Sequence, residues 1–411
     1  MPDSNLKIPT IYISFLLLRF KEPKSINFHK ISYNMKIVAD KNIPFLKGAL
    51  EPYADVTYMP GKEINKEALK GADALLIRTR TKCTDGLLEG TSVKFIGTAT
   101  IGFDHINTKY CEANNIEWVN APGCNSSSVQ QYIAAALLKL SSDFRFKLKD
   151  KTIGIIGVGN VGSKVEKFAR LLGMNVLLND PPRARVEGDE KFVKLDALLS
   201  ESDIVTVHVP LNIVGEDCTY RLFDDKKFKK LKKGSWFLNS SRGEVIKTSS
   251  LKNILGAGKP GGVVLDVWEN EPDIDLDLME DTFIATPHIA GYSTDGKANG
   301  TAMVVNSLCD HFDLPLKNWY PHNIPKPADP EISINCKGKS DEEVIREAVF
   351  GTYNIAIDDI NLRFSPSDFE KFRSDYPLRR EFTSYKIDLK SGTKRVQKML
   401  ETLGFGILSQ Y

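Results

Sequence analysis

The sequence has few of the features that mark secreted, metal-binding or nucleic-acid-binding proteins. Its 411 residues include only six cysteines, at irregular separations and without a C-x-x-C pair, which argues against a disulfide framework or a zinc cluster. We therefore expect reduced thiols, a cytoplasmic location and no metal ion. The formal net charge is only +2, with both signs dispersed, so there is no electrostatic case for a nucleic-acid or membrane partner.

Long apolar runs are also missing. The only block that raises a membrane question is IYISFLLL near the N-terminus, far shorter than the ~20 residues that span a bilayer. No small-residue cleavage site follows it, which argues against a signal peptide. We expect the fold to begin near Met35, and residues 1–34 to be an extension or an artefact of start-codon choice.

From Met35 onward, short β-rich runs alternate with helical patterns, which predicts parallel sheets covered on both faces. We expect an α/β fold with two doubly wound, Rossmann- or flavodoxin-like lobes around a cleft. The expected lobes cover residues 35–127 and 128–294, and the segment SSSVQQYIAAALLKLSSDF forms a long connecting helix with its serines as N-caps. After the proline-rich PHNIPKPADPEI we expect a small C-terminal α+β domain over 321–411.

The segment GVGNVG has the context that a dinucleotide-binding loop requires, because it follows the strand TIGII and opens a helix. Gly157 permits the tight turn, Gly159 lets the backbone approach a pyrophosphate, and Gly162 allows close packing of helix on strand. Asn160 and Val161, in the same loop, are further expected cofactor contacts. This pattern predicts a cofactor site.

The next strand, MNVLLND, ends at Asp180. A carboxylate at this position can accept hydrogen bonds from both ribose hydroxyls and would repel a 2′-phosphate, so we expect NAD rather than NADP. Arg183 and Arg185 keep NADP open as an alternative, since a cation beside the ribose can accommodate the extra phosphate.

Further downstream, Arg242, Asp266, Glu271 and His288 each follow an apolar strand, and ligands bind at the carboxyl ends of such strands. An imidazole can accept a hydroxyl proton as hydride leaves the same carbon, and a nearby carboxylate stabilises the imidazolium. A guanidinium can bind a substrate carboxylate. Taken singly, His288 could be a packed histidine and Glu271 a solvated turn, but the whole set favours oxidation of an α-hydroxy acid.

The series GVGNVG, HVPL, NSSRGEV, LDVWENEP and TPHIAGY resembles the D-isomer-specific 2-hydroxyacid dehydrogenases, over about residues 35–320. The resemblance implies an NAD-dependent homodimer, with a C-terminal dimerisation domain and a first lobe completed by about residues 295–320. It implies catalytic roles for Arg242, Glu271 and the general acid/base His288. It also implies cofactor contacts from Asp180, Ser240, Ser241, Asp266 and Gly291, and substrate contacts from Thr79, Thr100 and Tyr292.

The sequence departs from the family pattern at two places. Gln131 stands where many members carry a glutamate, and Asn212 stands where a threonine is common after HVPL. Neither position touches the proposed chemistry, so we expect little functional change from either.

Within this family, DPPRA, IRTRTK, TATIGFDHIN and the extra C-terminal domain resemble members that oxidise 4-phospho-D-erythronate in pyridoxal 5′-phosphate biosynthesis. A phosphorylated substrate needs an anion pocket, and Arg78, Arg80 and Lys82 would point the same way in an extended stretch. A solvated basic loop is the alternative. Arg379 and Arg380 could supply a second anion contact across a dimer interface.

Two other functions stay open at this point. The chain could oxidise another D-2-hydroxy acid, such as 3-phosphoglycerate, because the sequence indicates the residues of the substrate pocket less clearly than the catalytic residues. It could also be an NAD(H)-sensing corepressor that binds peptides, which a complete Arg–Glu–His set does not exclude.

Overall fold

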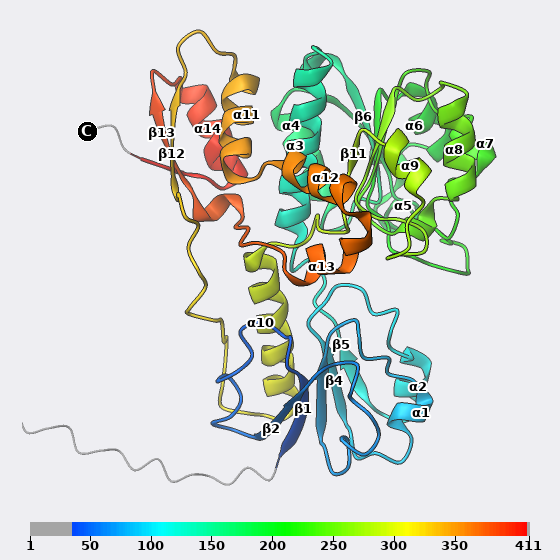
Figure 1. Ribbon diagram of the computed structural model, residues 1–411, viewed down its shortest axis with the longest axis vertical. Coiled ribbons are helices and arrows are strands. Elements are labelled where there is room, and N and C mark those ends of the chain that lie inside the picture. Colours follow the sequence, from blue (N-terminus) through cyan, green and yellow to red (C-terminus); the bar gives the residue numbers. More distant parts are fainter. Residues whose placement is uncertain (1–34, 409–411) are drawn as a thin grey trace, which may run out of the picture.

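The computed structural model describes residues 35–408 of the chain. The expected extension over residues 1–34 lies outside the described residues, as do residues 409–411. Figure 1 shows two large lobes, one holding β1 to β5 and the other β6 to β11, with a smaller third unit beside the second lobe. All strand pairs within the three sheets are parallel, which confirms the predicted α/β class.

The first lobe is built on a five-stranded sheet with the order β2-β1-β3-β4-β5. Helix α10 (Thr294–His311) comes much later in the chain but packs on this sheet, where Val304 and Leu308 share a buried core with Phe95 of β4. The other elements of this lobe are β1 (Lys36–Asp40), β2 (Asp55–Met59), β3 (Ala74–Ile77), α1 (Asp85–Leu88), β4 (Phe95–Thr98), α2 (Thr108–Ala113) and β5 (Glu117–Val119).

The second lobe contains a six-stranded sheet with the order β11-β10-β9-β8-β6-β7. Strands β8 and β9 are buried at every position, as strands covered on both faces must be. Strand β7 lies on one side of β6, and β8 to β11 lie on the other. The β6–β8 boundary is therefore the topological switch point, where sheets of this kind bind ligands. The elements are β6 (Thr152–Ile156), α4 (Gly162–Leu171), β7 (Asn175–Asn179), α5 (Pro181–Glu187), α6 (Leu195–Glu201), β8 (Ile204–Val207), α7 (Asp225–Phe228), β9 (Trp236–Asn239), α8 (Thr248–Gly256), β10 (Gly262–Leu265), α9 (Leu276–Asp281) and β11 (Ile284–Ala285).

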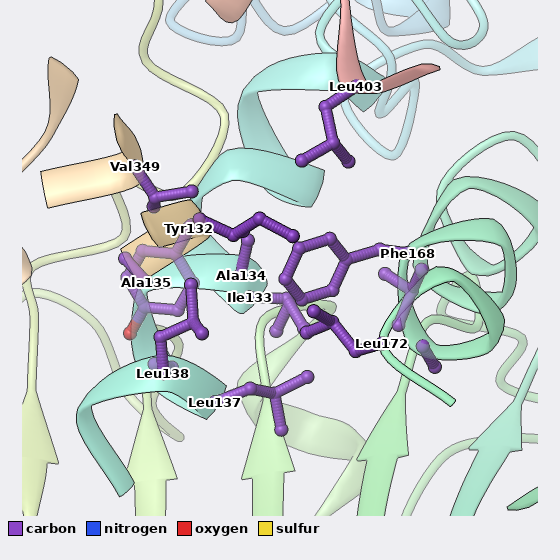
Figure 2. Packing of buried hydrophobic residues seen from close by; sticks show 14 of the residues in the cluster. Tyr132, Ile133, Ala134, Ala135, Leu137, Leu138, Phe168, Leu172, Val349 and Leu403 are labelled. Carbon is purple, nitrogen blue, oxygen red and sulfur yellow. The ribbon is translucent and has the colours of Figure 1, made fainter. Parts of the chain in front are cut away.

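Helix α3 (Ser126–Asp143) connects the two lobes and is buried along most of its length. Figure 2 shows its Tyr132, Ile133 and Leu137 packed among side chains that come from α4 and from the third unit, including Phe168 and Leu403. The expectation that serines cap this helix is wrong. Asn125 is the N-cap residue, and the Ser126 hydroxyl instead donates to the Gly123 carbonyl in the preceding turn at 2.8 Å.

The third unit has a three-stranded sheet with the order β12-β13-β14, and α12 and α13 extend from it toward the large lobes (Figure 1). Ser340 and Glu343 form a reciprocal capping box at the start of α11, which satisfies two backbone N–H groups at that end. Asp359 of α12 accepts a hydrogen bond from Ala285 N at 2.7 Å and so covers the edge strand β11. The elements are β12 (Glu331–Asn335), α11 (Asp341–Thr352), α12 (Ile355–Phe364), α13 (Phe369–Ser374), β13 (Lys386–Lys390), α14 (Lys394–Leu403) and β14 (Gly406–Ile407).

Arg379 joins the third unit to the second lobe. The residue is only 4% exposed, and its guanidinium donates to the Gln131 side chain at 2.8 Å, to Ser128 O at 2.6 Å and to Ile289 O at 3.2 Å. Gln131, one of the two expected departures from the family pattern, is thus a neutral acceptor for Arg379. The expected anion contact is not what this geometry provides, because all these bonds are internal to the fold.

Arg380 was expected to share that anion contact and is also engaged elsewhere. Its guanidinium binds both carboxylate oxygens of Asp295, at the start of α10, at 2.8 and 2.9 Å.

Within residues 35–408, no helix is long and apolar enough to cross a membrane.

Replacing Arg379 with Met should destabilise the full chain by about 2–4 kcal/mol, because buried acceptors on α3 and beside His288 lose their charged donor. Thermal unfolding of the variant should show a melting temperature lower by several degrees. Arg395→Met is the matched control, since the Arg395 side chain is 80% exposed and should change stability by less than about 0.5 kcal/mol. Equal effects of the two substitutions would contradict the role assigned to Arg379.

Candidate active site

The glycine loop after β6 leaves open space at one position and close contacts at two others. A Cβ on Gly162 would lie 2.0 Å from the Gly157 carbonyl oxygen, and Gly157 itself has φ +83° and abuts the backbone of His208. A Cβ on Gly159 would meet nothing within 4 Å. Gly157 and Gly162 are therefore required by the fold, whereas Gly159 leaves space for a bound group, as a pyrophosphate requires.

Two of the other loop residues, Asn160 and Val161, pack against neighbouring parts of the fold. The Asn160 side chain lies against Gly123, where an added Cβ would approach it to 2.7 Å, so it touches the turn that leads into α3. Val161 is the N-cap residue of α4 and is partly buried against the core.

Asp180 lies at the carboxyl end of β7. Its carboxylate accepts hydrogen bonds from Val158 N in the glycine loop at 2.7 Å and from Arg183 N at 3.1 Å. The Arg183 side chain pairs with Glu187 at 2.6 Å, and Arg185 pairs with Asp217. Both arginines that could have held a 2′-phosphate already have carboxylate partners, which supports NAD as the cofactor.

The loop after β9 carries the expected serines. The Ser240 hydroxyl oxygen is buried and has no hydrogen-bond partner within residues 35–408, so it is free to bond to a ligand. Ser241 instead bonds to the Asn239 side chain through both its N–H and its hydroxyl, at 3.0 and 2.8 Å. Gly291 lies against Asn125, whose amide donates to the Gly291 carbonyl at 3.2 Å.

Asp266 is buried at the end of β10, with 1% of its surface exposed. Its carboxylate accepts hydrogen bonds from the Thr286 hydroxyl at 2.7 Å, Ile289 N at 2.8 Å and Ala290 N at 2.9 Å. Burial raises the pKa of this carboxyl above its ordinary value, against the opposing effects of the nearby His288 and of these donors. Asp266 thereby fixes the loop that carries His288.

His288 and Glu271 are in direct contact. The His288 Nδ1 lies 2.7 Å from one Glu271 carboxylate oxygen, and the other accepts from Trp268 N at 2.9 Å. Burial alone would raise the pKa of Glu271, but the His288 charge and hydrogen bond and the Trp268 N–H hold this pKa below its ordinary value. Glu271 therefore stays ionised at neutral pH, and the His288 Nε2 has no partner in the part of the chain that the structure describes.

Arg242 extends from the second lobe toward the first. One of its nitrogens donates to Ser241 O at 2.8 Å, and its Nε lies 3.8 Å from the Asp104 carboxylate. A Cβ on Gly102 would lie only 2.3 Å from the guanidinium. Arg242 therefore lies at the junction of the two lobes, where its guanidinium could contact a small acid bound between the lobes.

The first lobe contributes polar groups at the ends of β3 and β4. The Thr100 hydroxyl lies 2.7 Å from that of Thr98, which in turn lies 3.1 Å from His105 Nε2. Arg78 donates to Asn42 O at 3.2 Å, and Arg80 forms an ion pair with Glu370 of α13. Thr79 and Lys82 are exposed.

Tyr292 lies between α10 and α13. Its ring meets Tyr376 edge-on at 5.8 Å, and two cations lie near the same ring, Lys297 at 5.0 Å and Arg373 at 5.7 Å from its centroid. Sequence reasoning missed Lys297, Arg373 and Glu370. The only available signal was a lysine among small residues shortly after His288, because contacts between α13 and the first lobe leave no local pattern.

A glycine loop at the edge of one of two α/β lobes, with the His288–Glu271 pair beside the same sheet, is typical of an NAD-dependent dehydrogenase. In agreement, the family model described as "D-isomer specific 2-hydroxyacid dehydrogenase, NAD binding domain" matches residues 128–290. A second model, described only as a domain of unknown function, matches residues 324–404.

Curated relatives narrow the class. Erythronate-4-phosphate dehydrogenase of Bacteroides fragilis is 49% identical over 354 residues, covering 86% of this chain and 99% of the relative. That of Proteus mirabilis is 41% identical over 374 residues, covering 90% and 99%. The chain therefore belongs to the erythronate-4-phosphate dehydrogenases, within the D-isomer-specific 2-hydroxyacid dehydrogenase family.

Solved structures agree with this fold and cofactor. The D-lactate dehydrogenase of Aquifex aeolicus, complexed with NAD and lactic acid, is 25% identical with a TM-score of 0.57, covering 68% of this chain and 95% of that chain. The NAD⁺-bound 3-phosphoglycerate dehydrogenase of Entamoeba histolytica is 25% identical with a TM-score of 0.58, covering 71% and 100%. The expectation of NAD is confirmed.

Two glycine substitutions should separate the roles of the cofactor loop. Gly162→Ala forces a Cβ against the Gly157 carbonyl, so it should lower the melting temperature of the protein without cofactor and weaken NAD binding by about tenfold or more. Gly159→Ala meets open space, so it should leave that melting temperature unchanged and weaken NAD binding alone. Thermal unfolding and calorimetric titration with NAD measure both effects. Unchanged NAD affinity in Gly159→Ala would contradict a pyrophosphate at this loop.

Proposed function

We propose that this protein oxidises C2 of 4-phospho-D-erythronate with NAD⁺, giving 2-oxo-3-hydroxy-4-phosphobutanoate, in the biosynthesis of pyridoxal 5′-phosphate. The observation that carries the proposal is the His288–Glu271 pair at the carboxyl edge of the NAD-binding sheet, with Arg242 at the lobe junction. The names of the curated relatives support the substrate.

The cofactor residues lie along one edge of the second sheet. Bound NAD⁺ supplies the acceptor for the hydride that leaves C2. The residues that would hold it are Gly157, Gly159, Asn160, Val161, Gly162, Asp180, Ser240, Ser241, Asp266 and Gly291. The open space at Gly159 supports this set, as does the Ser240 hydroxyl, which has no hydrogen-bond partner in the described part of the chain. Asp266 and Ser241 also have partners inside the fold.

His288 is proposed to move the proton. Its Nε2 takes the proton of the C2 hydroxyl while the C2–H bond breaks and hydride departs, so that C2 becomes a carbonyl carbon. Glu271 holds the ring through Nδ1 and stabilises the imidazolium that forms, because its own carboxyl remains ionised. In the reverse direction the same imidazolium returns the proton.

Arg242 is proposed to bind the substrate carboxylate and polarise the developing carbonyl. A guanidinium can do so through two parallel hydrogen bonds, each contributing roughly 1.5–3 kcal/mol. Its place beside Gly102 would bring the reacting carbon between the lobes, where excluded water strengthens these interactions.

Thr79, Thr100 and Tyr292 are proposed to contact the substrate, with Arg78 and Arg80 near its phosphate. For Arg80 this requires the guanidinium to share or leave its ion pair with Glu370.

We further propose that the enzyme is cytoplasmic and forms a homodimer through its C-terminal domain. A second candidate substrate is 3-phosphoglycerate, which the likeness to the Entamoeba histolytica enzyme favours.

A substrate panel on wild type and His288→Asn tests this function by NADH absorbance. Wild type should turn over 4-phospho-D-erythronate with a higher kcat/KM than 3-phospho-D-glycerate or D-lactate. His288→Asn should lower kcat by about 10²–10⁴-fold, because no group takes the proton, with NAD affinity unchanged. His322→Asn, which alters an exposed histidine, is the matched control. A fully active His288→Asn enzyme would rule out the proton role, and absent turnover in wild type would rule out the function.

A further inference from the structure

Lys297 is a half-buried cation that has no carboxylate partner among the residues that the structure describes. It lies near the start of α10, and its ammonium is 5.0 Å from the centroid of the Tyr292 ring. Neither a hydrogen bond nor an ion pair of its ammonium is found within residues 35–408. Burial, and to a lesser extent the charge of neighbouring Arg78, lower the pKa of Lys297 to about 8. Burying a cation beside a like charge raises the free energy of the folded protein unless an anion binds next to it.

Arg373 presents a second cation to the same ring, at 5.7 Å from its centroid. Its Nε is buried and has no hydrogen-bond partner in the described part of the chain. Its other end pairs with Glu370 at 2.9 Å, and Glu370 also pairs with Arg80. The charge of Arg373 is also the smallest of the influences that lower the pKa of Glu271.

These four cations, which we call the cation cluster (Arg78, Arg80, Lys297 and Arg373), come from three separate segments. Arg78 and Arg80 follow β3, Lys297 is on α10 and Arg373 is on α13. Glu370 is the carboxylate that pairs with members of the cluster in the described residues, so the cluster has an excess of positive charge. A phosphate monoester, which carries close to two negative charges at neutral pH, would neutralise most of this excess.

We propose that Lys297 and Arg373 are the main phosphate-binding groups of the substrate site, with the Tyr292 ring holding both cations in place. The proposal rests on the function given above and deepens it, since it assigns phosphate recognition to α10 and the C-terminal unit. The ammonium acts as a point charge, and the guanidinium of Arg373 offers directed N–H donors. Discrimination between phosphorylated and unphosphorylated acids then depends on the third unit being docked.

Paired substrates test this assignment. In Lys297→Gln, KM for 4-phospho-D-erythronate should rise about tenfold or more, because a charge-assisted contact is lost, while KM for D-erythronate should change less than about twofold. Lys297→Arg should restore most of the preference for the phosphorylated acid. Lys109→Gln alters an exposed lysine of the first lobe and should leave both values unchanged. An equal change of the two KM values in Lys297→Gln would overturn the proposal.

Inorganic phosphate provides a readout that does not depend on turnover. Phosphate should raise the melting temperature of the wild-type chain and of Lys297→Arg, and should raise that of Lys297→Gln much less. The same phosphate-dependent rise in wild type and Lys297→Gln would overturn the assignment. If wild type oxidised no hydroxy acid, the proposed function would fail, and this titration would still decide the role of Lys297.

Discussion

The buried carboxylate of Asp266 fixes the part of the molecule on which the chemistry depends. It accepts hydrogen bonds from the Thr286 hydroxyl and from two successive N–H groups, Ile289 and Ala290, which follow His288 directly. A charge taken out of water is retained only when such donors satisfy it. The result is a loop in which His288 adopts a left-handed backbone conformation, with φ +57°, and directs its Nδ1 toward Glu271. If His288 accepts the proton as proposed, a ring held in this way needs little reorganisation during the reaction.

The small third unit contributes to this arrangement from the opposite side. Arg379 donates to the Ile289 carbonyl and to α3, so the loop that carries His288 is held by both Asp266 and the third unit. Helix α13 places Glu370 against Arg80 of the first lobe and Arg373 beside the Tyr292 ring. The site is therefore built from all three units. In the proposed mechanism, recognition of a phosphorylated acid requires their docking, whereas the residues proposed for hydride transfer lie mainly in the second lobe.

Sequence patterns predicted the features that depend on local structure. The α/β class, the NAD loop and the placement of Arg242, Glu271 and His288 after apolar strands follow from periodicity and from the ends of parallel strands. Contacts between segments far apart in the chain could not be predicted in this way. The ion pair of Arg80 with Glu370 and the burial of Arg379 against Gln131 are set by how the units dock. The prediction that serines cap α3 was wrong for a local reason, because Asn125 precedes the serines and occupies the N-cap position.

The most direct test of the proton-transfer geometry is a crystal structure of the enzyme with NADH and 2-oxo-3-hydroxy-4-phosphobutanoate. The account predicts His288 Nε2 at about 3 Å from the C2 oxygen, with Glu271 still bound to Nδ1. A complex in which the C2 oxygen bonds to other groups and the His288 ring lies beyond hydrogen-bond reach would contradict it.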